Sequence, residues 1–323
     1  MAPKDTAPPA PETAPRLPDT AQDLPPLRAL LQDVTVEATP AQIDGEADMA
    51  ALLPSGSSVY IPFLPGGSVE PVIRASAQVR ARGLVPVPHV PARTMPSRAA
   101  LDDFLARLRE AGADRMLLIA GDTSTPRGPF ASTLDLLETG LPVRHGFRMM
   151  GVAGHPEGHP VADDDTLFRA LLEKRAYARE TGTEMWIVTQ FIFTSEPLFH
   201  WLDRLAVSGL DLPVRVGVPG PTRLKTLIRM AMACGVGQSA RMLAKRPDMV
   251  GRLFSRWTPD DLVGALAGYR ARWPEHNLAG MHVFPFGGLR VAATWLDRLR
   301  SGEESVPVTV PETGGSTVLA GAE

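Results

Sequence analysis

The sequence predicts a (β/α)8 TIM barrel, and three observations support this prediction. Short apolar runs alternate with longer amphipathic stretches from about residue 33 to residue 300. Eight such runs occur, and the roughly 270 residues that hold them match the usual size of this fold. Most of the runs are apolar throughout, as in parallel strands that are covered on both faces. An open doubly wound sheet shows the same alternation and is the alternative.

Each expected element follows from this pattern in chain order. The expected strands are residues 34–38, 58–63, 84–90, 115–120, 148–153, 184–190, 214–218 and 280–284. Helices should lie between them, for example over residues 98–111 and 165–180, where leucines recur at helical spacing. Glycines such as Gly112 and Gly182 stand where helices should end. Extra helices within residues 222–272 would form an insertion between strands 7 and 8.

The composition of the two ends differs from that of the middle. Residues 1–26 hold eight of the 32 prolines and few bulky apolar side chains, so we expect a disordered tail. We expect residues 27–300 to form the barrel and residues 301–323 to form a flexible tail. The first segment lacks the pattern of a signal peptide, and no apolar run approaches about 18 residues. A soluble, cytoplasmic protein is therefore expected, with no membrane partner.

Charge and cysteine content exclude several classes of function. The chain has 33 Lys and Arg against 36 Asp and Glu, which argues against a nucleic acid partner. A single cysteine excludes a disulfide framework and a cysteine-based metal cluster. Neither the Gly-x-Gly-x-x-Gly fingerprint nor a P-loop occurs, so a nucleotide cofactor would have to be held in another way.

Polar residues follow the expected strands, at the end where barrel enzymes carry their chemistry. Glu37 interrupts an apolar strand, where burial would suit it to be a general acid, although pairing with a basic side chain is equally open. Asp122 follows Gly121, either beside a ligand or as a turn residue. Gln190 ends a strand and offers a donor and an acceptor to the edge of a heterocycle, or is simply solvated.

Two histidines four residues apart raise the question of a metal pair. His155 and His159 would face one way on a helix, but Pro156, Gly158 and Pro160 place this segment in a loop. No third ligand is evident nearby, so we expect no metal.

Several motifs, in the right order over residues 33–298, resemble those of the methylenetetrahydrofolate reductase family. Residues 151–160, Gly-Val-Ala-Gly-His-Pro-Glu-Gly-His-Pro, resemble its Gly-Val-Ala-(Gly/Ala)-Tyr-Pro-Glu-x-His-Pro signature. Residues 189–193 resemble its Thr-Gln-(Phe/Leu)-Phe-Phe segment, and residues 34–40 its opening Val-Ser-Phe-Glu-Phe-Phe-Pro strand. Shorter matches are Pro88-His89, Gly121-Asp122, residues 130–132 and residues 281–284.

The resemblance implies a barrel that binds FAD without a Rossmann motif and reduces 5,10-methylenetetrahydrofolate to the 5-methyl form with NADH or NADPH. Glu37 would protonate the bridging nitrogen of this reduced folate, Asp122 would lie near the flavin and the pterin, and Gln190 would bind the folate. The residues implied to line the flavin, together with Asp122, are His89, Gly121, Phe130, Ala131, His155 and His159. Lys174 or Arg175 would meet its phosphates. A homo-oligomer is left open.

The chain departs from the family pattern at several positions. The second strand continues as Ile61-Pro62-Phe63 and lacks a flavin-contacting threonine, Ala120 stands in place of an arginine, and His155 replaces tyrosine. The segment 285–290 displaces or lacks the arginine expected on the substrate side. These departures keep two alternatives open: a flavin-independent reductase of the same folate, and a non-catalytic folate-binding subunit or paralogue.

Overall fold

The computed structural model describes residues 25–121, 123–159, 162–233, 255–303 and 306–307. Eight parallel strands form a closed barrel in the order β1-β10-β7-β6-β5-β4-β3-β2. The predicted (β/α)8 barrel is therefore confirmed, and the open sheet is excluded. The strands are β1 (Thr35–Glu37), β2 (Ser58–Ile61), β3 (Val85–Pro91), β4 (Arg115–Ile119), β5 (Met149–Gly154), β6 (Glu184–Phe191), β7 (Val214–Pro219) and β10 (Leu278–Phe284).

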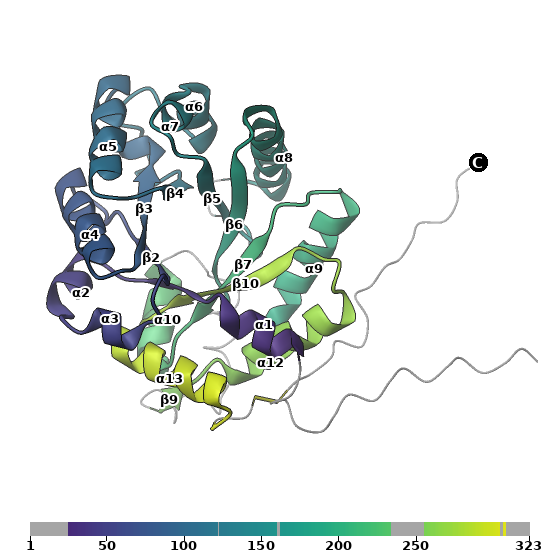
Figure 1. Ribbon diagram of the computed structural model, residues 1–323. Helices are drawn as coiled ribbons and strands as arrows, with labels where there is room; N and C mark the ends of the chain where they lie inside the picture. The colour runs from purple at the N-terminus through teal and green to yellow at the C-terminus, as the bar shows by residue number, and fades with distance from the viewer. Residues whose placement is uncertain (1–24, 122, 160–161, 234–254, 304–305, 308–323) are drawn as a thin grey trace, which may run out of the picture.

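Helices surround the barrel on its outside (Figure 1). Their apolar faces are buried against the strands, as Leu101, Phe104 and Leu105 of α5 illustrate. The helices are α1 (Pro25–Gln32), α2 (Pro40–Gly45), α3 (Met49–Leu52), α4 (Val69–Ala81), α5 (Arg98–Glu110), α6 (Thr133–Glu138), α7 (Leu141–Arg144), α8 (Asp164–Thr181), α9 (Ser195–Val207), α10 (Leu224–Ala233), α12 (Asp260–Arg272) and α13 (Leu289–Ser301), with a 3-10 turn, η2 (Ala92–Thr94). No helix in this described part of the chain is long and apolar enough to cross a membrane.

The expected insertion lies between β7 and β10. It contains α10 and a two-stranded antiparallel ribbon of β8 (Thr222–Arg223) and β9 (Arg256–Trp257), ahead of α12. Leu224 and Leu227 of α10 are buried in an apolar cluster with Phe191 and Phe193, which lie at and just after the end of β6. The insertion therefore packs at the end of the barrel where β6 finishes.

The third strand contains Pro86, Pro88 and Pro91, although proline is unusual in an interior strand. Because Pro86 and Pro88 are two residues apart, their missing N–H groups lie on one edge of β3, and the strand still pairs with β2 and β4. The proline rings fix φ on both sides of His89. The backbone that carries His89 is consequently stiff.

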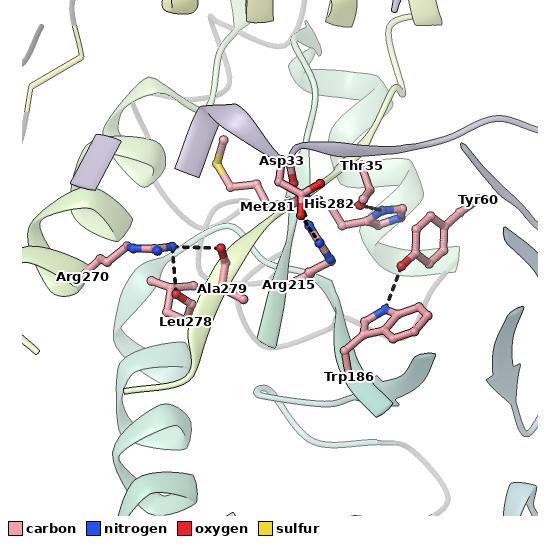
Figure 2. Close-up of polar contacts among 10 residues, drawn as sticks. All are labelled: Asp33, Thr35, Tyr60, Trp186, Arg215, Arg270, Leu278, Ala279, Met281 and His282. Carbon is pink, nitrogen blue, oxygen red and sulfur yellow. Dashed lines mark hydrogen bonds and ion pairs between the residues drawn. The ribbon is translucent and has the colours of Figure 1, made fainter. Parts of the chain in front are cut away.

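Polar side chains inside the barrel are paired with one another (Figure 2). Trp186 Nε1 donates to Tyr60 Oη at 2.8 Å, and Thr35 Oγ1 lies 2.8 Å from His282 Nδ1. The Arg215 guanidinium binds the Asp33 carboxylate and donates to its carbonyl oxygen. The Trp186–Tyr60 and Thr35–His282 pairs satisfy polar groups in the interior, as a water-poor core requires, whereas the Asp33 side chain is exposed.

Candidate active site

The parallel strands bring the sequence-predicted polar residues to one rim of the barrel. Glu37 is the last residue of β1, Gln190 lies near the end of β6, and His155 directly follows β5. Because all the barrel strands run in the same direction, these ends lie at the same mouth. This is the arrangement on which the predicted site depends.

Glu37 and His89 face each other across β2. Glu37 Oε2 lies 3.8 Å from His89 Nε2, and their side chains are 21% and 9% exposed. Burial raises the pKa of Glu37 from 4.5 to about 8 and lowers the pKa of His89 from 6.5 to about 3. At neutral pH both groups are uncharged, so Glu37 carries a proton in the mouth of the barrel.

Gln190 is held in a β-bulge rather than at a regular strand end. The pairing of β6 with β7 shifts between Val188 and Phe191, so β6 has one more residue here than β7. A Cβ on Gly217 would lie 2.6 Å from the Thr189 carbonyl oxygen and 2.7 Å from that of Gln190. The bulge therefore needs glycine at position 217, and it turns Gln190 towards the loop after β5.

The Gln190 side chain bridges the two ends of that loop. Its Oε1 lies 3.4 Å from His155 Nδ1, and its Nε2 donates to the Gly158 carbonyl oxygen at 3.4 Å. The rings of His155 and His159 meet edge to face with centroids 4.8 Å apart. Burial, and secondarily the neighbouring His159, lowers the pKa of His155 to about 4, so this histidine is neutral at physiological pH. The structure thus brings His155, His159 and Gln190 together.

A cavity of about 590 Å³ opens beside these residues, a volume in the usual range for organic ligands. Of the predicted flavin-lining residues, Gly121, Ala131, His155 and His159 line it, and so does Lys174. Its apolar wall includes Leu118, Leu167, Phe168 and Trp201. The cavity is therefore shaped for a mostly apolar ligand that carries a polar or charged end.

Lys174 supplies an ammonium group to this cavity. The residue is only 8% exposed, and burial lowers its pKa to about 8. No carboxylate in the described ranges forms an ion pair with it, whereas Arg204, which also lines the cavity, is bonded to Asp165 at 2.7 Å. A buried cation of this kind is costly unless an anion neutralises it, so Lys174 is a candidate partner for an anionic group of a ligand.

Other predicted residues are placed differently. Arg175 Nε donates to Asp211 at 2.6 Å, and Arg175 is not among the residues that line the cavity. Phe130 is buried and also outside the lining, and His89 lies inside the barrel mouth beside Glu37. Asp122 falls outside the described residues.

The structure shows where the arginine of segment 285–290 lies, and it adds a second arginine that the sequence did not indicate. Arg290, the arginine of segment 285–290, binds Glu46 at 2.8 Å from the outer helix α13. Arg93, which the sequence reasoning missed, lines the cavity and donates to the carbonyl oxygen of Ala131 at 2.8 Å. Its position two residues after the third strand, on the functional rim, was the available signal.

Comparisons with known proteins agree with the sequence motifs. Over 146 residues the chain is 27% identical to "Methylenetetrahydrofolate reductase 1" of Schizosaccharomyces pombe, covering 43% of this chain and 24% of that relative. The chain thus spans about a quarter of the length of this curated relative.

Among solved structures, the chain is similar to dihydropteroate synthase from Thermus thermophilus in complex with 6HMPPP, with 15% identity, a TM-score of 0.44, and coverage of 85% of this chain and 95% of that one. It is also similar to N-acetylneuraminate lyase from Fusobacterium nucleatum, with 9% identity, a TM-score of 0.44, and coverage of 83% of this chain and 73% of that one. The model of the family described as "Methylenetetrahydrofolate reductase" matches residues 54–247, more than half of the chain. The chain therefore belongs to the methylenetetrahydrofolate reductase family.

Proposed function

We propose that this protein reduces 5,10-methylenetetrahydrofolate to 5-methyltetrahydrofolate, with NADH or NADPH as the hydride source and FAD as the intermediate carrier. The observation that carries the proposal is the position of Glu37, a largely buried carboxyl group with a raised pKa in the mouth of a barrel whose family acts on this folate. Reduction of the substrate requires both a hydride and a proton, and in this proposal Glu37 gives the proton.

The cavity beside the barrel mouth fits the flavin. Its apolar wall suits a flat ring system, and the buried ammonium of Lys174 suits the negative charge of a pyrophosphate. His155 and His159 border the same cavity and, together with Ala131 and Gly121, would hold the rest of the cofactor. When bound, FAD would supply the hydride-transfer chemistry, and the chain would supply its position and electrostatics.

In this proposal Glu37 protonates the bridging nitrogen of the folate, and the five-membered ring opens to an iminium that accepts the hydride at the one-carbon unit. The raised pKa of Glu37, to about 8, keeps the proton available at physiological pH. A carboxyl group with an ordinary pKa would be ionised there and could not act as the acid.

Gln190 binds the heterocycle edge of the folate in this proposal. Both of its side-chain contacts, to His155 and to the Gly158 carbonyl oxygen, are long at 3.4 Å. Hydrogen bonds of this length are weak and can be exchanged for shorter ones to a ligand. The amide then offers one donor group and one acceptor to the substrate.

The test is Glu37→Gln, which keeps the size of the side chain and removes its proton. We expect folate reduction to fall by about 10²–10⁴-fold, while oxidation of NADH or NADPH with an artificial electron acceptor stays near the native rate. Glu110→Gln, at an exposed position on α5, is the matched control. Equal loss of both half-reactions in Glu37→Gln, with the control unaffected, would contradict the role of general acid.

Direct hydride transfer from NADH to the folate, without flavin, is the second candidate. It is favoured by Ala120, which lines the cavity where the family pattern has an arginine, so that position contributes no charge. The visible absorbance spectrum of the purified chain, taken after incubation with FAD and removal of the unbound flavin, separates the two candidates, because only a flavin-binding chain retains the absorbance of the cofactor. A non-catalytic folate-binding subunit would bind the reduced folate and form no product with either nicotinamide nucleotide.

A further inference from the structure

The His89 side chain has an unused hydrogen-bonding atom in the mouth of the barrel. His89 is 7% exposed, and its Nε2 has no hydrogen-bond partner among the described residues. A buried polar atom without a partner is costly, and native proteins rarely leave one in that state. Some group therefore meets Nε2 in the working protein.

The His89 side chain is carried by a restrained backbone and packs against a neighbouring ring. Pro88 and Pro91 restrict the backbone on either side, and β3 pairs with β4 at this residue. The ring of Tyr60 meets that of His89 edge to face, with centroids 6.3 Å apart. Turning the imidazole away from the mouth would break this packing.

The neighbouring polar groups inside the barrel already have partners. Tyr60 Oη accepts from Trp186, and His282 Nδ1 is paired with the Thr35 hydroxyl. The Glu37 carboxyl group, in contrast, lies 3.8 Å from Nε2. A rotation of the Glu37 side chain that shortens this distance by about 1 Å gives a normal hydrogen bond.

The charges around the pair favour a neutral hydrogen bond over an ion pair. Among the described residues, the ring of Tyr60 on β2 meets that of His89, and His282 on β10 packs against Tyr60 and interacts electrostatically with His89. Burial raises the pKa of Tyr60 to about 12 and holds that of His282 well below its ordinary value, so both are uncharged. A protonated Glu37 beside a neutral His89 is thus the state that these surroundings support.

We infer that His89 is a positioning residue for Glu37: its Nε2 accepts a hydrogen bond from the protonated carboxyl group and holds that group at the reacting centre. This inference rests on the proposed function for its catalytic consequence. It differs from the role implied by the family resemblance, in which His89 lines the flavin. The two roles predict different behaviour of the same variants.

The experiment compares His89→Asn with His89→Gln. The glutamine amide reaches the position of Nε2, whereas the asparagine amide reaches only that of Nδ1, so the second variant should restore the contact. Misplacing a catalytic group by about 1 Å can lower the rate about 10²-fold. We therefore expect the rate of folate reduction to fall about 10²-fold in His89→Asn and to recover substantially in His89→Gln. His145→Asn, at a histidine that binds Asp102 on the outside of the barrel, is the matched control.

A second readout needs neither cofactor nor turnover. NMR titration of ¹³C-labelled Glu carboxyl groups, with the Glu37 signal identified by its loss in Glu37→Gln, reports the proton affinity of Glu37 in the chain alone. Losing a hydrogen bond that stabilises the protonated form should lower the Glu37 pKa by about one unit, a tenfold change, in His89→Asn but not in His89→Gln. An unchanged pKa in His89→Asn overturns the inference, and so does equal loss of flavin binding in both variants. Absence of folate reduction in the native chain would count against the proposed function alone, because the titration would still report the contact.

Discussion

Replacing Glu37 by glutamine should stabilise the folded chain, and the gain should grow with pH. Burial raises the pKa of Glu37 from 4.5 to about 8, so the folded chain keeps a proton that the unfolded chain releases across this range. The free energy of unfolding of the native chain therefore falls as the pH rises from 4.5 to about 8. Glutamine has no proton to release, so the variant lacks this decrease.

The size of the effect follows from the two pKa values. The difference between 4.5 and about 8, at about 1.4 kcal/mol for each pH unit, corresponds to about 5 kcal/mol. Solvent reaches 21% of the Glu37 side chain and lowers the cost of ionisation there. Between pH 4.5 and about 8, the free energy of unfolding of Glu37→Gln should therefore rise by about 3–5 kcal/mol relative to that of the native chain.

Urea unfolding, followed by tryptophan fluorescence from about pH 5 to about pH 8.5, measures this difference. Comparison of the variant with the native chain cancels the opposite slope from His89, whose lowered pKa makes stability fall as the pH drops from 6.5 towards 3. Glu110→Gln, at an exposed site, should show no such trend. A stability difference between Glu37→Gln and the native chain that stays constant with pH would refute the assignment of a buried, protonated carboxyl group.

Three further predictions concern the cavity and the bulge. Lys174→Met should weaken FAD binding by about 10- to 100-fold, measured by flavin fluorescence titration, because a charged hydrogen bond is lost; native affinity in this variant would contradict an anion site at Lys174. Binding by the native chain should weaken as the pH rises through about 8, the lowered pKa of Lys174, and a pH-independent affinity would count against the same site. Gly217→Ala should cost about 1–3 kcal/mol of stability in urea unfolding and raise the KM for the folate, because the new Cβ would press on the bulge that carries Gln190; an unchanged KM would separate the bulge from substrate binding. Arg175→Met is the control for Lys174→Met. Because Arg175 is bonded to Asp211, its replacement should leave the FAD affinity unchanged.

The barrel and its functional rim could be predicted because they depend on local patterns. Continuous apolar runs and intervening amphipathic stretches place the strands, and parallel direction alone then brings Glu37 and Gln190 to the same mouth. The ends of the strands were less predictable. The third strand, for example, runs to Pro91 rather than residue 90.

Contacts between distant residues could not be predicted. Whether Glu37 would meet a cation or an imidazole depends on His89, which lies 52 positions away in sequence and only 3.8 Å away in space. Which of Lys174 and Arg175 could meet a cofactor phosphate depends on Asp211, which binds Arg175, whereas Lys174 lines the cavity. The bulge at Gln190 had one signal in the sequence, namely Gly217 inside an apolar strand.

The central claim is that this barrel reduces the folate with hydride from a flavin and that Glu37 supplies the proton. The measurement that tests it most directly is formation of 5-methyltetrahydrofolate by the purified chain, supplied with FAD, NADH or NADPH, and 5,10-methylenetetrahydrofolate, in the native form and in Glu37→Gln. The account predicts product from the native chain, dependent on FAD, and a loss of about 10²-fold or more in the variant, whose flavin is still reduced by the nicotinamide nucleotide. Product formation at equal rates in the two proteins would contradict it.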